Sequence, residues 1–164
     1  MQIEKIAFLD RDGVLNEEIG NYVTQIDDFK ILPHTINNCL AIKKLGFQIV
    51  IVTNQGGLAK KLYTEEALES FHQKLQSEFI NSGIIILDIF YCPHHSEVEN
   101  CICRKPKGGM LERGLAKYGG IKEKCFMIGD NIRDVNAALS AGIDQAYEIK
   151  SNEDWITVLQ NIIA

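Results

Sequence analysis

The chain has 164 residues, of which 46% are apolar and 24% charged, and its formal net charge is -5. This composition excludes a disordered or fibrous protein, and the length fits a single domain over residues 1–164. An acidic balance disfavours nucleic-acid binding, because proteins that bind nucleic acid nonspecifically present a basic face to the phosphates. We therefore expect a globular protein without a nucleic-acid partner.

No apolar run approaches the roughly 20 residues that cross a bilayer, and Met1–Lys5 lacks the basic and apolar order of a signal peptide. Five cysteines, an odd number, also argue against a disulfide framework. We expect a cytoplasmic monomer with no membrane partner.

Short apolar runs alternate with longer segments of helical periodicity. A first strand is expected at 6–9, followed by a loop to Pro33 and a helix at 35–45 that Gly46 ends. The continuous β-branched run at 47–52 is typical of a strand buried on both faces. The first third of the chain therefore has the order strand, helix, strand.

The same alternation continues to the end of the chain. Thr64 has the chemistry of a helix cap, and the helix that it opens closes at Gly83. The later elements are expected as strands at 84–91, 125–128 and 143–149, a loop at 92–109, and helices at 110–118, from Asn131 to Gly142, and at 154–163. The pattern predicts an α/β protein with a Rossmann-like parallel sheet and helices on both faces. Since these elements use up the chain, we expect no separate cap domain.

Polar side chains follow three of the expected strands, where ligands bind in open parallel sheets. They are Asp10, Asp12, Thr53, Asn54, Asp130 and Asp134. If strand geometry persisted, Asp10 and Asp12 would point to one face and repel each other, and a divalent cation would offset that repulsion. With Asp130 they predict an oxygen-rich magnesium site. The alternatives are a turn at Asp10–Gly13 and a helix cap at Asp130.

Four soft ligands fall within twelve residues of one another. Cys92, His94, Cys101 and Cys103 supply three thiolates and one imidazole, which suits a closed tetrahedral zinc site. A closed site leaves no position for water, so zinc is expected to be structural and to order a loop at about 92–106. The alternative is cysteines without a metal.

Two further groups of residues can be explained without a role in function. The basic run at 104–107 is either a solvated surface segment or a binding site for an anionic substrate. His34, His72 and His95 are expected to be surface or capping residues.

Four motifs in this order resemble those of the haloacid dehalogenase superfamily of phosphotransferases. They are Asp10-Arg11-Asp12-Gly13-Val14, Thr53, Lys105 and Gly129-Asp130-Asn131-Ile132-Arg133-Asp134. The resemblance implies that Asp10 is the nucleophile that becomes an aspartyl phosphate and that Asp12 is the general acid and base. It further implies that Thr53 and Lys105 hold the phosphoryl group. The implied magnesium ligands are Asp10, Asp12 through its backbone carbonyl, and Asp130.

Within that superfamily, the Cys-x-His and Cys-x-Cys-Arg-Lys-Pro pattern resembles a subfamily of D-glycero-D-manno-heptose 1,7-bisphosphate 7-phosphatases and histidinol-phosphate phosphatases. The other motifs resemble the heptose enzymes more. A small phosphorylated sugar is therefore the implied substrate, and hydrolysis of its 7-phosphate the implied reaction. The implied substrate-binding residues are Glu18, Gly20, Tyr22, Asn54, Gln55, Gly56, Arg104 and Asn131.

The sequence leaves three alternative functions open. Histidinol-phosphate hydrolysis is compatible with the same zinc loop. A nucleic-acid end phosphatase suits an acidic chain less well. A zinc-organised binding module without catalysis would be expected to have lost part of the acidic set, yet Asp10, Asp12, Lys105 and Asp130 are all present.

Overall fold

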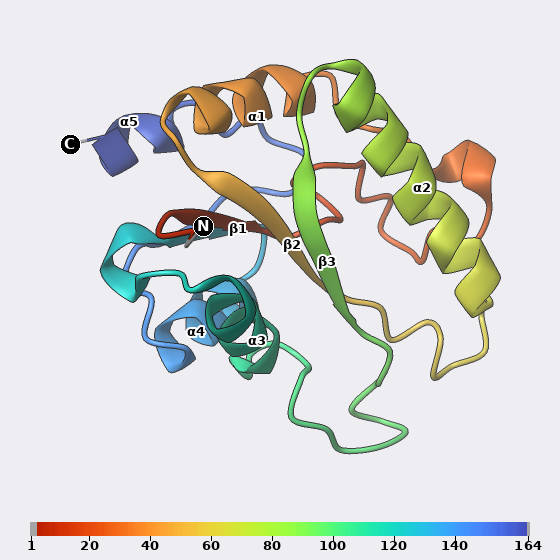
Figure 1. Ribbon diagram of the computed structural model, residues 1–164. Coiled ribbons are helices and arrows are strands. Elements are labelled where there is room, and N and C mark those ends of the chain that lie inside the picture. Colours follow the sequence, from red (N-terminus) through yellow and green to blue (C-terminus); the bar gives the residue numbers. More distant parts are fainter. Residues whose placement is uncertain (1–2, 164) are drawn as a thin grey trace.

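A five-stranded parallel sheet with helices on both faces forms the centre of the computed structural model, which describes residues 3–163 (Figure 1). The strand order is β3-β2-β1-β4-β5. The strands are β1 (Ile6–Leu9), β2 (Gln48–Asn54), β3 (Ile86–Cys92), β4 (Phe126–Gly129) and β5 (Ala146–Glu148). The helices are α1 (Thr35–Lys44), α2 (Glu65–Asn81), α3 (Gly109–Tyr118), α4 (Ile132–Ser140) and α5 (Val158–Ile163), with short 3-10 turns at Ile26–Asp28 and Lys122–Lys124. The predicted Rossmann-like architecture is confirmed.

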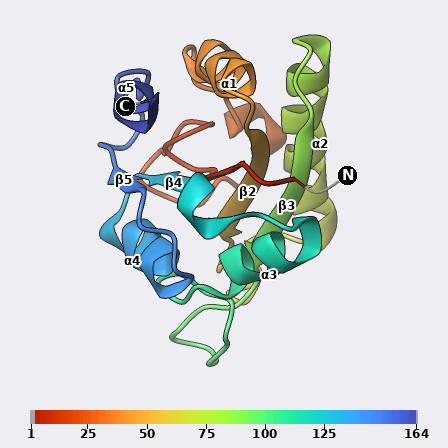
Figure 2. The same ribbon diagram turned by 60° about the vertical axis from the view of Figure 1, so that its left-hand side comes forward.

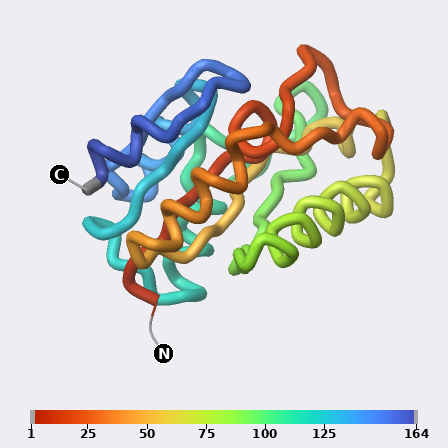
Figure 3. Tube along the Cα trace, turned by 90° about the horizontal axis from the view of Figure 1, so that it is seen from above, coloured from red at the N-terminus to blue at the C-terminus, as the bar shows by residue number. Residues whose placement is uncertain are grey.

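Two hydrophobic cores lie on opposite faces of the sheet. Helices α1, α2 and α5 cover one face, and α3 and α4 cover the other (Figure 2). Seen from above, α1 lies between α5 and α2 on the first face (Figure 3). Alternate residues of β1 enter the two cores, with Ala7 and Leu9 in the first and Ile6 and Phe8 in the second. This two-sided burial explains why the strands have continuous apolar runs.

The largest differences from the predicted element bounds are at β5 and α5. Strand β5 spans only Ala146–Glu148, because it pairs with the short β4 while Ile143 and Ile149 are buried in opposite cores. Helix α5 begins at Val158, after the predicted residue 154. The cause is Trp155, which is fully buried and donates its indole N–H to the carbonyl of Val14 at 3.0 Å.

No cap domain is present among residues 3–163. The longest segments between a strand and the next helix are 10–34 and 93–108, and within them the only regular element is the 3-10 turn at Ile26–Asp28. In the same residues, no helix has the length and apolar character of a membrane span. Because all five strands run parallel, the loops after β1, β2, β3 and β4 lie at the same carboxyl edge of the sheet.

Candidate active site

A cleft of about 360 Å³ opens at the carboxyl ends of the strands. Twelve of the residues predicted for the site line it: Asp10, Asp12, Glu18, Gly20, Tyr22, Thr53, Asn54, Gln55, Gly56, Arg104, Lys105 and Asp130. Asn131 does not line the cleft. Its side chain caps α4 by accepting from the backbone N–H of Arg133 at 3.1 Å, so the predicted cap at Asp130 lies one residue later.

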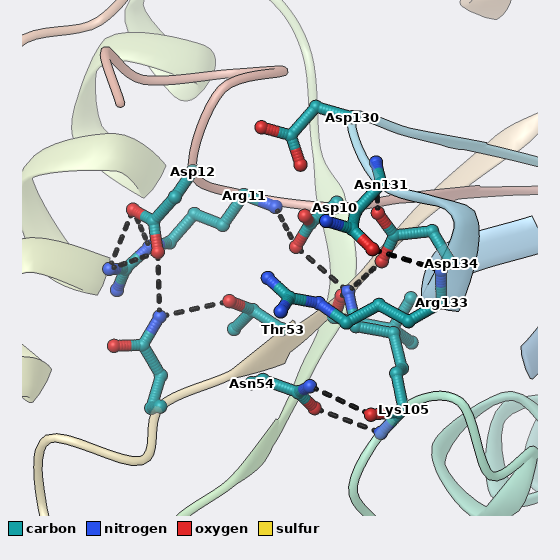
Figure 4. Close-up of polar contacts among 12 residues, drawn as sticks. Asp10, Arg11, Asp12, Thr53, Asn54, Lys105, Asp130, Asn131, Arg133 and Asp134 are labelled. Atoms are coloured by element: carbon teal, nitrogen blue, oxygen red, sulfur yellow. Dashed lines mark hydrogen bonds and ion pairs between the residues drawn. The ribbon is translucent and has the colours of Figure 1, made fainter. Parts of the chain in front are cut away.

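A buried ammonium group lies between two carboxylates in the floor of the cleft. Lys105 Nζ is 2.9 Å from Asp10 Oδ1 and 2.6 Å from Asp134 Oδ1, and it also donates to the carbonyl of Val52 at 2.9 Å (Figure 4). All three charged side chains are buried. A charged amine so held is suited to an anionic group that arrives beside Asp10.

Three carboxylates converge near this amine. Asp10, Asp130 and Asp134 each offer an oxygen, and these oxygens lie within 4.8 Å of one another. Burial and the negative charge of Asp134 raise the pKa of Asp10 to about 8. A divalent cation bound by oxygen ligands would offset this repulsion, so the residues fit magnesium. Asp134 was not among the predicted ligands.

The Asp12 carboxylate points away from Asp10, so strand geometry does not persist through these two residues and they do not share one face (Figure 4). Strand β1 ends at Leu9, and Gly13 turns the chain with a positive φ of 82°. A Cβ atom at Gly13 would lie 2.1 Å from Asp130 Oδ2, so no side chain fits there.

Hydrogen bonds hold the Asp12 carboxylate in its own pocket. It accepts from Arg11 Nη2 at 2.9 Å, Asn16 Nδ2 at 2.8 Å and Gln55 Nε2 at 3.0 Å. Burial by itself raises the pKa of Asp12, but the charge of Arg11 and these hydrogen bonds bring it below its ordinary value. Asp12 is therefore a carboxylate in the resting protein.

The position of His72 corrects the expectation that it is a surface or capping residue. It lies on α2, is buried, and contacts Arg11 Nη1 through Nε2 at 3.2 Å. Burial and the neighbouring guanidinium lower the pKa of His72 to about 3, so its imidazole is neutral and accepts this hydrogen bond. His72 thus supports the residue that holds Asp12.

The side-chain amides of Asn54 and Gln55 form hydrogen bonds with other residues of the protein. Asn54 exchanges two hydrogen bonds with the backbone of Lys105, at 3.0 and 3.1 Å. Gln55 donates to Asp12 and to Thr53 Oγ1, the latter at 2.9 Å. Both residues line the cleft, but their side chains fix neighbouring catalytic candidates.

The four predicted zinc ligands lie together beside the cleft. The Sγ atom of Cys92 is 3.7 Å from that of Cys101 and 3.1 Å from that of Cys103. Nδ1 of His94 is 3.5 Å from Cys92 Sγ and 3.2 Å from Cys103 Sγ. Tetrahedral zinc with bonds of about 2.3 Å to sulfur separates its ligands by about 3.5–3.8 Å. The donor set fits a closed zinc site, and its four ligand atoms lie within 4.8 Å of one another, although the two contacts of 3.1 and 3.2 Å are shorter than zinc would impose.

One thiol of this cluster is predisposed to ionise. Burial raises the pKa of Cys101, but hydrogen bonds from the backbone N–H groups of Arg104 and Cys103 lower it to about 7. Thiolates are the form that binds zinc. The same loop contacts the segment after β2 through an ion pair between Lys60 and Glu97 at 3.0 Å, and its residues His95 and Arg104 line the cleft.

Among the residues of the site that were given no role there by the sequence are Tyr63, His95, Arg133 and Ser151. Tyr63, His95 and Arg133 line the cleft, and Ser151 donates to Asp130 Oδ2 at 2.5 Å. His95 corrects the expectation of an ordinary surface residue, since its ring packs against Gly56, where a Cβ would lie 2.7 Å from His95 Cδ2. Arg133 lies within the fourth motif, whereas no local pattern marks the other three, because their positions depend on contacts between loops.

Known proteins are similar to this chain in sequence and in fold. The chain matches the haloacid dehalogenase-like hydrolase family over residues 3–142. It is 35% identical to the D-glycero-alpha-D-manno-heptose-1,7-bisphosphate 7-phosphatase of Photorhabdus laumondii subsp. laumondii, covering 97% of this chain and 90% of that protein. It is 38% identical to the D-glycero-beta-D-manno-heptose-1,7-bisphosphate 7-phosphatase of Yersinia pestis, covering 83% and 75%.

A solved structure of a phosphatase has a similar fold. The D,D-heptose 1,7-bisphosphate phosphatase from B. bronchiseptica, crystallised with magnesium and phosphate, superposes with a TM-score of 0.84 at 29% identity, covering 96% of this chain and 86% of that one. Fold, site and relatives define a phosphatase. The chain belongs to the haloacid dehalogenase-like hydrolases, which confirms the resemblance drawn from its four motifs.

Proposed function

We propose that this protein hydrolyses the 7-phosphate of D-glycero-D-manno-heptose 1,7-bisphosphate. The observation that carries the proposal is the pairing of Asp10 with the buried ammonium of Lys105 in the cleft, in a chain similar over 97% of its length to a phosphatase named for that substrate. We further propose that residues 1–164 act as one cytoplasmic, monomeric catalytic unit.

The first half of the reaction transfers the phosphoryl group to Asp10. A carboxylate oxygen of Asp10 attacks phosphorus, the bond from phosphorus to the sugar oxygen breaks, and Asp12 gives its proton to the departing oxygen. Asp12 is a carboxylate at rest, so it must first take up a proton. The negative charge of the arriving phosphoryl group raises its pKa and favours that uptake.

The second half regenerates the enzyme. Asp12 removes a proton from water, the water oxygen attacks the phosphorus of the aspartyl phosphate, and inorganic phosphate leaves Asp10 free. Thr53 and Lys105 hold the phosphoryl oxygens in both halves. Magnesium, held by Asp10, the backbone carbonyl of Asp12 and Asp130, would neutralise phosphoryl charge when bound.

Residues of the cleft wall would recognise the rest of the substrate. Arg104 and Arg133 provide positive charge for the phosphate that is not transferred. Glu18, Gly20 and Tyr22 lie on the loop after β1, where they would contact the sugar. We propose that zinc on Cys92, His94, Cys101 and Cys103 orders the loop that carries Arg104.

Phosphate release tests this proposal. Purified protein with magnesium is given both anomers of heptose 1,7-bisphosphate and, in parallel, histidinol phosphate, with Asp10→Asn as the blank. We expect the bisphosphate to be preferred by at least about 100-fold in kcat/KM, since two phosphate contacts contribute to binding. Preference for histidinol phosphate would reassign the substrate, and full activity in the variant would exclude Asp10 as nucleophile.

A further inference from the structure

A chain of hydrogen bonds runs from Tyr63 through Gln55 to the reacting groups. The hydroxyl of Tyr63 donates to Gln55 Oε1 at 2.6 Å. Gln55 Nε2 then donates to Asp12 Oδ2 at 3.0 Å and to Thr53 Oγ1 at 2.9 Å. Because an amide nitrogen has two hydrogens, these two bonds use its whole donor capacity.

The direction of every hydrogen bond in this chain is fixed. The Asp12 carboxylate only accepts, which places the amide nitrogen of Gln55 beside it and leaves the oxygen for Tyr63. The Thr53 hydroxyl must then accept from Gln55. Its own hydrogen is left to be donated elsewhere, and Thr53 lines the cleft.

The start of the chain is rigid. A Cβ atom at Gly57 would lie 2.2 Å from Tyr63 Cε1, so the ring packs directly on the backbone of Gly57. Phe71 holds the ring from another side, with centroids 6.3 Å apart. Burial raises the pKa of Tyr63 to about 12, so its hydroxyl remains a donor. Gln55 itself is 3% exposed.

We propose that Gln55, anchored by Tyr63, is a positioning residue for phosphoryl transfer and does not bind substrate directly. Its amide aims the Thr53 hydroxyl hydrogen at the transferring phosphoryl group and keeps the Asp12 carboxylate in reach of the leaving oxygen. The proposal rests on the phosphatase chemistry proposed above. It replaces the substrate-binding role that the sequence implied for Gln55.

The test compares Gln55→Leu, Tyr63→Phe and the double variant on two esters. In p-nitrophenyl phosphate the weakly basic phenolate leaves without a proton, whereas glycerol 2-phosphate needs an acid. We expect Gln55→Leu to lower kcat/KM about 100-fold on glycerol 2-phosphate and about 10-fold on p-nitrophenyl phosphate, because kcat/KM reports the transfer to Asp10 and only the first ester needs a proton from Asp12 in that step. KM should change by less than about 3-fold, since Gln55 does not touch substrate.

Tyr63→Phe removes only the hydroxyl, so the expected losses have the same pattern and are about tenfold smaller. The double variant should be no slower than Gln55→Leu, because both residues act through one chain of hydrogen bonds. Tyr91→Phe, an exposed tyrosine on β3, is the matched control and should leave both rates unchanged. Zinc content and melting temperature establish that each variant is folded.

Other results would overturn the proposal. A large rise in KM with unchanged kcat would mean that Gln55 binds substrate. Additive losses in the double variant, or equal losses on the two esters, would mean that the residues do not act together through Asp12. Neither ester contains a heptose, so a wild-type protein that cleaves both but not heptose bisphosphate would overturn the substrate assignment alone.

Discussion

Lys105 Nζ lies 2.9 Å from Oδ1 of Asp10, and both groups are buried, although 95 residues separate them in the chain. The amine thus lies beside the proposed nucleophile and is in place for the phosphoryl charge during transfer. Asp134, 2.6 Å from the same amine, keeps it in position.

Lys105→Met should remove activity and stability together. The variant leaves Asp10 and Asp134 without their cation, so we expect kcat to fall at least about 1000-fold and the free energy of unfolding to fall by about 3 kcal/mol. Rate assays and urea denaturation measure the two effects. Lys44→Met, an exposed lysine on α1, is the control. Retention of a tenth of the activity would contradict the role of Lys105.

Magnesium should stabilise the protein more at alkaline than at acidic pH. In the metal-free protein, burial and repulsion by Asp134 raise the pKa of Asp10 from 3.8 to about 8. A carboxyl group whose pKa is higher in the folded than in the unfolded protein stabilises the fold fully at pH values below its unfolded pKa. That stabilisation is lost as the pH rises through about 8, the pKa of Asp10 in the folded protein. Magnesium offsets the repulsion that causes this loss.

The measurement is the rise in melting temperature on adding magnesium at about pH 5 and about pH 8.5, which should be larger at the higher pH. Magnesium is removed with a cation-exchange resin, because a strong chelator would also take zinc. Asp10→Asn should abolish the pH dependence. Equal stabilisation at both pH values would show that Asp10 does not hold the ion.

Cys101→Ser should release zinc before it affects the acidic site. Loss of one thiolate weakens the metal site and frees the loop, so we expect zinc below one per chain and a melting temperature lower by at least about 5 °C. Metal analysis and thermal unfolding provide the readouts. Cys39→Ala changes a buried cysteine outside the cluster and should keep zinc at one per chain. Full zinc in Cys101→Ser would remove Cys101 from the ligand set.

Ser151→Ala should weaken the response to magnesium. The hydroxyl of Ser151 donates to Asp130 Oδ2 at 2.5 Å and orients a proposed metal ligand. We expect the magnesium concentration for half-maximal rate to rise about tenfold, with Ser151→Thr restoring it. Calorimetric titration with magnesium checks the affinity directly. Ser140→Ala, at the exposed end of α4, is the control, and an unchanged affinity in Ser151→Ala would contradict the role.

Local pattern was enough to predict the elements and the strand-end motifs. Continuous apolar runs mark strands buried on both faces, and capping residues such as Thr64 mark helix starts, since both signals come from neighbouring residues. Parallel strands end at one edge of the sheet, so the strand pattern alone places Asp10, Thr53 and Asp130 together. The clustering of the four proposed zinc ligands was predictable because they lie within twelve residues of one another.

The orientation of the side chains in the site depends on contacts between segments that are far apart in the sequence. The turn at Gly13 separates Asp12 from Asp10, and His72 is buried because Arg11 meets it across 61 residues of sequence. His95 enters the cleft because the loop at 93–108 packs against Gly56. The sequence by itself thus determined which residue types reach the edge of the sheet. The tertiary structure decided which hydrogen bonds and charges hold each of them, because packing brings those partners together from separate loops.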